Sequence, residues 1–216
     1  TLAPELDGAP AVIRELRRRE IVVSMGHTAA TYGEAMAAIE AGIACGTHLF
    51  NAMPPFHHRE PGAAAALLTR DDVTVTLIAD GVHVHPAAVA MAWRCKPPQT
   101  LALISDAIAA LGMPPGTYPL GDTTLLWDGE SPRLEDGTLA GSATPLPVAV
   151  RNLRAWTGCT IAEALMTVTA APARLLGLPW GAPTVGAAAH LTVIDREMRV
   201  VATIVGGEPV FVQPRD

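Results

Sequence analysis

The sequence predicts an α/β protein in which a parallel sheet covered by helices precedes smaller antiparallel sheets. Between residues 17 and 107, short apolar runs rich in β-branched residues alternate with alanine-rich helical stretches. This alternation is typical of a parallel sheet that is buried on both faces. After Gly112 the segments become short, alternating and rich in turns, which is typical of antiparallel strands. With 216 residues, 50% of them hydrophobic, the chain can bury a substantial core.

The first half of the chain supplies the predicted parallel strands. They share an apolar core and are 21–24, 44–47, 73–79 and 101–105, with 1–3 as a fifth run. A helix is expected over 31–40, ended by Gly42 at a positive φ.

The second half predicts antiparallel strands, two helices and a strand-rich tail. The antiparallel strands are expected at 118–120, 123–127 and 133–139, the last with a turn at 136–137. Helices are expected at 146–156 and 161–176, the second capped by Thr160 with Glu163 three positions later. The tail, 190–195 and 200–212, again predicts antiparallel strands.

Composition excludes several classes of partner. The net charge is −6 and no basic run exceeds residues 17–19, which argues against nucleic acid. The longest stretch without a formal charge, 175–194, contains prolines and glycines and would make a poor membrane helix. Three scattered cysteines without CxxC spacing predict a reducing, cytoplasmic compartment. Phosphate-loop, dinucleotide and GxSxG motifs are not found in the sequence.

Polar side chains gather where the predicted parallel strands end. His27, His48 and His83 each follow a run, and Asp106 closes the fourth. Taken singly, a histidine here is equally well explained by a structural role. Together, imidazoles at one edge of a sheet suit zinc or another divalent metal, and a carboxylate beside them can transfer the protons of an activated water. Metal-assisted hydrolysis is the class of reaction that this pattern favours.

The loop after the His48 strand carries Arg59, which has two interpretations. It is either a surface arginine paired with Glu60 or a clamp for phosphate or carboxylate. His57 and His58 share this loop and are expected to face solvent, whereas His85 and His190 are expected to be structural.

Seven strings of residues then carry a resemblance. They are TLAPE at 1–5, GHT at 26–28, THLFNAM at 47–53, REPG at 59–62, ADGVHV at 79–84, SDA at 105–107 and GTLAGS at 137–142. In this order they resemble the N-acetylglucosamine-6-phosphate deacetylases of the amidohydrolase superfamily. The resemblance implies removal of acetate from N-acetylglucosamine 6-phosphate, in amino-sugar catabolism.

The resemblance also implies roles for individual residues. His27 and His48 would be ligands of a divalent metal, zinc or else iron, cobalt or manganese, and Asp106 the catalytic acid and base. The implied substrate-binding residues are Asn51, Ala52, Arg59, His83, Leu139, Ala140 and Gly141. The implied assembly is a homodimer in which the phosphate-binding arginine comes from the neighbouring subunit.

The implied fold is a partial (β/α)8 barrel over 1–185, with a β-rich insertion at 113–142, followed by strands of a small β-sandwich at 186–216. Segments that precede the first string in the family, including a metal-binding glutamate, have no counterpart here, so the chain is expected to be a piece with weak metal binding and little or no activity alone. Ser105 and Ile108 stand where the family usually or often has threonine. The alternatives are another amidohydrolase that acts on a different amide, and a non-catalytic fragment that binds sugar phosphate.

Overall fold

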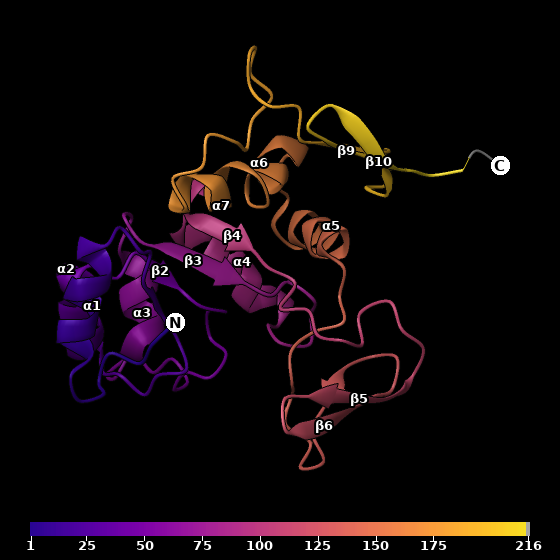
Figure 1. The fold of residues 1–216 in the computed structure, drawn as a ribbon. Coiled ribbons are helices and arrows are strands. Elements are labelled where there is room, and N and C mark those ends of the chain that lie inside the picture. The colour runs from indigo at the N-terminus through magenta and orange to yellow at the C-terminus, as the bar shows by residue number, and fades with distance from the viewer. Residues whose placement is uncertain (215–216) are drawn as a thin grey trace.

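A four-stranded parallel sheet forms the centre of the computed structural model, which describes residues 1–214 (Figure 1). Its strands, in spatial order, are β1 (Ser24–Met25), β2 (Cys45–Gly46), β3 (Thr74–Leu77) and β4 (Leu101–Leu103). All four were predicted from the sequence, although each strand is shorter than its apolar run. The fifth run contributes no strand, because only a single bridge joins Leu2 to Met25.

Within residues 1–214, five helices pack beside the sheet, and their order in space is their order along the chain. They are α1 (Ala9–Arg18), α2 (Tyr32–Ala41), α3 (Gly62–Thr69), α4 (Pro86–Cys95) and α5 (Leu146–Thr157). Each packs against the next, α1 on α2 through to α4 on α5. Strand order without reversal, with neighbouring helices in the same order, is the arrangement of a (β/α) barrel rather than of a doubly wound sheet.

Local sequence explains why α2 and α3 form. Thr31 caps α2 in a reciprocal pair with Glu34, and Gly42 ends the helix with φ 126°, as predicted. Residues 63–68 of α3 are all buried. A helix that is apolar on every side must lie inside the protein, so α3 packs between the sheet and its neighbouring helices.

The chain's single lysine, Lys96, is buried beneath α3 and has 1% of its surface exposed. Its Nζ donates to the backbone carbonyls of Leu67, Arg70 and Val73, at 3.3, 2.5 and 2.5 Å. Burial lowers the pKa of the ammonium group, although nearby carboxylates oppose that shift. Lys96 therefore supplies a buried hydrogen-bond donor to the backbone between the end of α3 and the start of β3.

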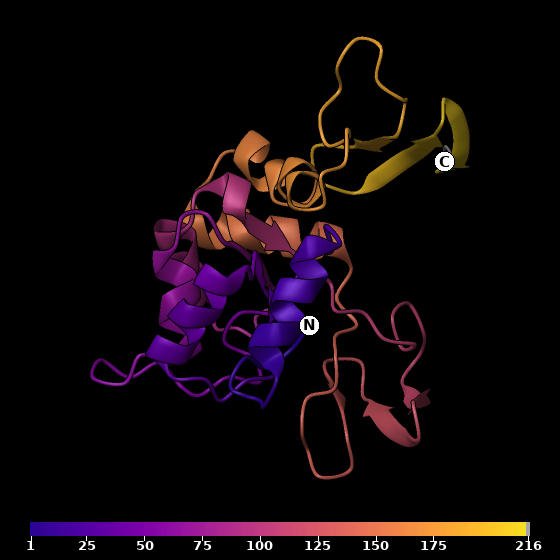
Figure 2. The same cartoon turned by 60° about the vertical axis from the view of Figure 1, so that its left-hand side comes forward.

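A separate antiparallel sheet follows β4. It contains β5 (Gly116–Leu120), β6 (Thr123–Trp127) and β7 (Pro132–Arg133), and both views place it away from the helical body (Figures 1 and 2). Its small core of Ala110, Leu125 and Ala140 is distinct from the main core. The predicted turn at 136–137 is present, but the returning strand is reduced to one bridge between Arg133 and Leu139.

The predicted helix over 161–176 is wrong in one respect, because two helices occupy it. They are α6 (Ile161–Met166), with the predicted capping box, and α7 (Ala170–Leu175). Pro172 lacks an N–H, and in a continuous helix its ring would clash with the carbonyl of Val168. As the third residue of α7 it is tolerated, so the helix restarts after Thr169.

The tail forms the predicted antiparallel strands, β8 (Leu191–Ile194), β9 (Val200–Val205) and β10 (Glu208–Val212). Ile194 and Met198 join this sheet to the main core, and an apolar groove of about 920 Å³ runs beside it along α5. Residues 215–216 of the predicted 186–216 portion lie outside the described residues. Within residues 1–214, no helix is both long and apolar enough to cross a bilayer.

Candidate active site

Two imidazoles meet at the carboxyl edge of the parallel sheet. His27 follows β1 and His48 follows the neighbouring β2, so parallel pairing brings the two residues together. Their Nε2 atoms are 2.8 Å apart, with ring centroids separated by 4.6 Å and the ring planes 74° apart. Two ring nitrogens directed at one point can share a proton or bind one cation.

The orientation of the His48 ring is set by its other nitrogen. Nδ1 lies 3.1 Å from the carbonyl oxygen of Asn51, which can only accept, so Nδ1 carries the hydrogen. The backbone N–H of His48 donates to Thr76 Oγ1 at 2.7 Å. These bonds leave a lone pair on Nε2 of a side chain that is nearly buried, which is the arrangement of a metal-binding histidine.

The two imidazoles are suitable ligands for a divalent metal, but they are fewer than the protein ligands of a catalytic zinc. Zinc bound to two imidazole nitrogens at tetrahedral angles holds them ~3.3 Å apart, so the rings need to open by a few tenths of an ångström. A catalytic zinc has three protein ligands. Within residues 1–214 no group of three histidine, cysteine, aspartate or glutamate side chains could hold a metal. The described residues thus offer two ligands of such a site.

Glu5 is bound to the segment that follows His27. Its carboxylate accepts from Thr28 Oγ1 at 2.5 Å and from the backbone N–H of Ala29 at 2.6 Å. Burial would raise the pKa of Glu5, but these hydrogen bonds outweigh it and lower the pKa. Glu5 therefore holds the segment that follows His27.

The loop after β2 brings Asn51 and Ala52 close to His27. The Asn51 amide donates to the carbonyls of His48 and Leu49, each at 3.3 Å. The carbonyl of Ala52 accepts from the N–H of Thr28 at 3.1 Å. The loops that follow β1 and β2 are joined by this last bond.

Several residues that follow the strands β1, β2 and β4 have backbones in the left-handed region. His27, His48 and Asp106 have φ values of 50°, 31° and 50°, and Phe50 and Ala52 have 77° and 49°. Non-glycine residues rarely adopt this conformation, and when they do they often mark functional sites. Three of the five are the residues that the sequence assigns to metal binding and catalysis.

His83 is held by Asp80 at the end of β3. The Nδ1–H donates to Asp80 Oδ2 at 2.6 Å, and both side chains are almost fully buried. Burial would raise the pKa of Asp80, but hydrogen bonds from the His83 ring and from the N–H groups of His83 and Val82 outweigh it and lower the pKa. Asp80 thus carries a negative charge at neutral pH.

Asp106 follows β4 and is exposed, and no hydrogen bond of its carboxyl group is found within residues 1–214. Its backbone carbonyl accepts from the N–H of Ser142 at 2.8 Å. Gly141 packs so closely that a Cβ there would lie 2.4 Å from Ile108 Cγ2 and 3.0 Å from the Asp106 carbonyl. The predicted substrate-binding segment 139–141 therefore lies against the predicted catalytic residue.

Among residues 1–214, the hydrogen bonds of Arg59 are with its loop neighbours His57 and His58. Arg59 is exposed, and its Nη1 donates to Nε2 of His58 at 2.9 Å. The alternative pairing with Glu60 is not among the ion pairs of residues 1–214. His57 and His58 are exposed, as predicted.

The two remaining histidines have structural contacts. His85 Nδ1 accepts from the N–H of Ala87 and caps α4. His190 Nδ1 accepts from the N–H of Gly206, and its ring packs edge-on against Trp180.

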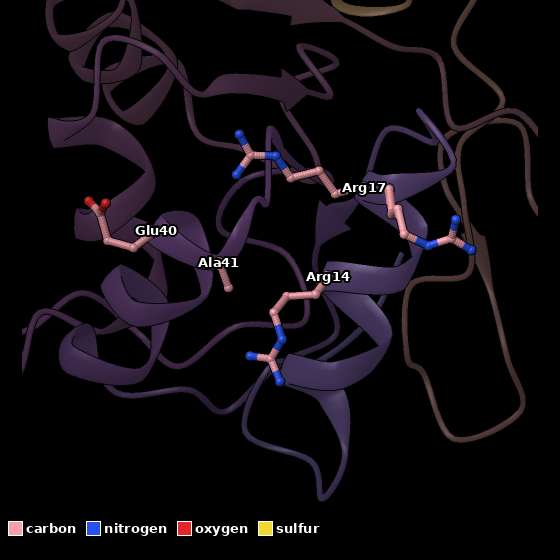
Figure 3. Close-up of a pocket in the computed structure, with 5 residues that line it drawn as sticks. Arg14, Arg17, Glu40 and Ala41 are labelled. Carbon is pink, nitrogen blue, oxygen red and sulfur yellow. The ribbon is translucent and has the colours of Figure 1, made fainter.

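A second hollow, of about 510 Å³, lies between α1 and α2 (Figure 3). It is lined by Arg14, Arg17, Arg18, Glu40 and Ala41. Arg18 is paired with Glu15 at 2.9 Å, and the Glu40 carboxylate is bound by Arg70. No sequence-predicted site residue lines this hollow, so it is separate from the paired histidines.

The parallel strands lie in chain order, and two imidazoles meet at their carboxyl edge. Together these features are typical of a barrel of the metal-dependent hydrolase type. The chain belongs to the amidohydrolase family, whose sequence profile matches residues 5–210. It is 43% identical over 220 residues to N-acetylglucosamine-6-phosphate deacetylase of Homo sapiens, covering 98% of this chain and 53% of that protein. The chain therefore spans about half the length of the curated relatives that it matches.

Two solved structures extend this similarity to the fold. One is N-acetyl-D-glucosamine-6-phosphate deacetylase of Mycobacterium smegmatis, a mutant in complex with N-acetyl-D-glucosamine-6-phosphate. It superimposes with a TM-score of 0.94 at 41% identity, over 98% of this chain and 57% of that one. The deacetylase of Thermotoga maritima gives 0.93 at 39% identity, over 98% and 58%. The expected family resemblance and amidohydrolase barrel fold are confirmed.

Proposed function

We propose that the chain carries the catalytic edge of a hydrolase that removes acetate from N-acetylglucosamine 6-phosphate. The observation that carries this proposal is the meeting of the His27 and His48 Nε2 atoms at 2.8 Å, at the sheet edge that Asp106 shares. Similarity to deacetylases along 98% of the chain supports the choice of substrate. The products are glucosamine 6-phosphate and acetate.

His27 and His48 hold the divalent metal in this proposal. Zinc suits two neutral imidazoles, and iron, cobalt or manganese are also accepted by such ligands. When bound, the metal polarises the amide carbonyl and lowers the pKa of a water molecule. The hydrogen bond from His48 Nδ1 to Asn51 keeps the Nε2 lone pair directed at that position.

Asp106 moves the proton. Its exposed carboxylate takes a proton from the attacking water as the water oxygen bonds to the acetamide carbon. The same group then returns a proton to the nitrogen as the carbon–nitrogen bond breaks. The close packing of Gly141 against the backbone carbonyl of Asp106 supports this placement, because it holds the backbone of the reacting residue beside the 139–141 segment.

The remaining site residues bind the sugar phosphate. His83 orients the sugar, and Asn51, Ala52, Leu139, Ala140 and Gly141 line the site. Arg59 binds the 6-phosphate, and its exposed position suits a homodimer in which it serves the neighbouring subunit. We further propose the division into a barrel portion 1–185 and a sandwich portion 186–216, and a cytoplasmic location, supported by three free cysteines.

One observation favours a second candidate function. The described residues offer two metal ligands, so the chain could bind a sugar phosphate without turning it over. Acetate release from N-acetylglucosamine 6-phosphate, measured with zinc and with mass-verified protein, distinguishes the two. Release that is lost in Asp106→Asn supports the deacetylase. Equal background release by both proteins contradicts it, and a melting temperature that still rises with the sugar phosphate then favours the binding function.

A further inference from the structure

The turn at the end of β3 is organised around one carboxylate. Asp80 Oδ1 accepts from the N–H groups of Val82 and His83 at 2.9 and 2.8 Å. Its Oδ2 accepts from the His83 ring at 2.6 Å. With 4% and 6% of the Asp80 and His83 side chains exposed, water competes little for these bonds.

Helix α5 supports the same turn from behind. Asn152 Nδ2 donates to the carbonyl of Ala79 at 2.9 Å. The ring of Trp156 covers Gly81, which has a φ of 84°, and a Cβ at Gly81 would lie 3.4 Å from the ring. Asp80 therefore sits on a fixed piece of backbone.

Asp80 also reaches the segment that carries Asp106. The buried Ser142 hydroxyl lies 3.5 Å from Asp80 Oδ2, at the long limit of a hydrogen bond. The N–H of Ser142 donates to the Asp106 carbonyl at 2.8 Å, and its carbonyl accepts from Ile108 at 3.2 Å. One carboxylate thus contacts both the His83 turn and the backbone partner of Asp106.

The arrangement determines which nitrogen of His83 carries the hydrogen. An ionised carboxylate only accepts, so Nδ1 must donate and Nε2 keeps its lone pair. Within residues 1–214, the one fully buried side-chain nitrogen or oxygen without a partner is Arg154 Nε. His83 Nε2, which has no partner there either, is therefore open to solvent or to a bound molecule.

We propose that Asp80 is a positioning residue that holds His83 as the Nδ1–H tautomer, so that Nε2 accepts a hydrogen bond from a hydroxyl group of the sugar. The identity of the ligand rests on the proposed function, whereas the tautomer rests only on the Asp80 contacts. Asparagine at position 80 would keep the backbone bonds but could turn an N–H toward His83 Nδ1. The ring would then place its hydrogen on Nε2 and lose the acceptor.

Nitrogen NMR of the chain with ¹⁵N-labelled histidine tests this inference, because ring nitrogens with and without hydrogen resonate apart. The His83 signals are identified by their loss in His83→Gln. At about pH 8.5, where an ordinary imidazole is neutral, His83 should show Nδ1–H and a lone pair on Nε2. Asp80→Asn should exchange the two. An Nε2–H tautomer in the unsubstituted chain overturns the proposal without any variant, as does an unchanged tautomer in Asp80→Asn.

Asp128→Asn is the matched control. Asp128 Oδ1 accepts from the N–H groups of Glu130 and Ser131 at 2.8 and 2.9 Å, the same turn without an imidazole. The control should leave the His83 signals unchanged. Titration with N-acetylglucosamine 6-phosphate should then shift the Nε2 signal, and a saturating ligand that leaves Nε2 unmoved overturns the acceptor role. Neither NMR readout requires the chain to hydrolyse its ligand. A chain that fails to release acetate therefore contradicts the proposed function without contradicting the role of Asp80.

Discussion

His27, His48 and Asp106 combine chemistry with a strained backbone. A left-handed conformation costs a non-glycine residue roughly 1–2 kcal/mol, because Cβ crowds the backbone. Glycine would relieve the strain at each position but would remove the side chain that the proposed function requires. These φ values of 50°, 31° and 50° indicate that the surrounding loops, through contacts such as that of Ala52 with Thr28, hold the residues in place.

Metal binding should depend on His48. In His48→Asn the Nε2 ligand is lost, and we expect at least about a tenfold loss of zinc affinity. The rise in melting temperature on adding zinc measures this change. His57→Gln removes an exposed imidazole outside the pair and should keep the full rise. Equal zinc stabilisation of both variants would show that the metal binds elsewhere.

The charge of Asp80 should contribute stability that depends on pH. Its pKa in the folded chain lies below the ordinary value of 3.8. The contribution is therefore complete above the unfolded pKa and is lost as pH falls through the folded one. The difference in unfolding free energy between the unsubstituted chain and Asp80→Asn should shrink as the pH falls below about 4. Urea unfolding between about pH 5 and about pH 3 measures it, and a difference that grows over this acid range would contradict the assignment.

Sequence reasoning could find the histidine pair because consecutive parallel strands end at one edge of a sheet. It assigned no role to Asp80, although a carboxylate three residues before His83 was visible in the sequence. It could not place Ser142 against Asp80, because 62 residues of chain separate them and only the tertiary fold brings them together. For Arg59 the sequence left two interpretations open, a surface pair with Glu60 and an anion clamp, and the side chain contacts His58 rather than Glu60.

At the scale of the elements, capping residues in the sequence predicted where a helix begins better than the apolar pattern predicted how far it continues. Thr160 and Glu163 form the expected capping box of α6. The apolar pattern continues through Pro172, so a pattern-based prediction joins α6 to α7 although proline ends the hydrogen-bond ladder. The parallel strands were predicted because their runs are apolar on both faces. The number of residues that pair in each strand depends on how neighbouring strands align, which the sequence of a single run does not contain.

The segment that carries Gly141 should tolerate no side chain. Gly141→Ala would place Cβ against Ile108 and keep a positive φ of 66°, so we expect a loss of about 1–3 kcal/mol in unfolding free energy. Gly112→Ala is the matched control, since its φ is also positive, at 77°, but no atom lies within 4 Å of its Cβ. Chemical denaturation of both variants measures the difference. Equal destabilisation would mean that backbone strain, and not the contact with Ile108, explains the effect.

At the scale of the whole molecule, residues 1–214 contain two hydrophobic cores of unequal size. The sheet of β5–β7 rests on Ala110, Leu125 and Ala140, whereas β1–β4 lie within the main core. A small core opens at lower free energy than a large one. Amide hydrogen exchange should therefore be faster at Tyr118 and Leu125, which are paired between β5 and β6, than at Val75 in β3 and Leu103 in β4. Equal protection at the four amides would show that the two cores unfold together.

Because Lys96 is buried, reagents that acylate amines should react very little with the folded chain. Apart from the terminal amine, the Nζ of Lys96 is the only primary amine in the sequence, and three carbonyls surround it. An acylating reagent should therefore label Lys96 only in molecules whose α3 and β3 have separated. The fraction of labelled Lys96 peptide, followed by mass spectrometry during denaturant titration, would report the opening of the main core from a single native atom.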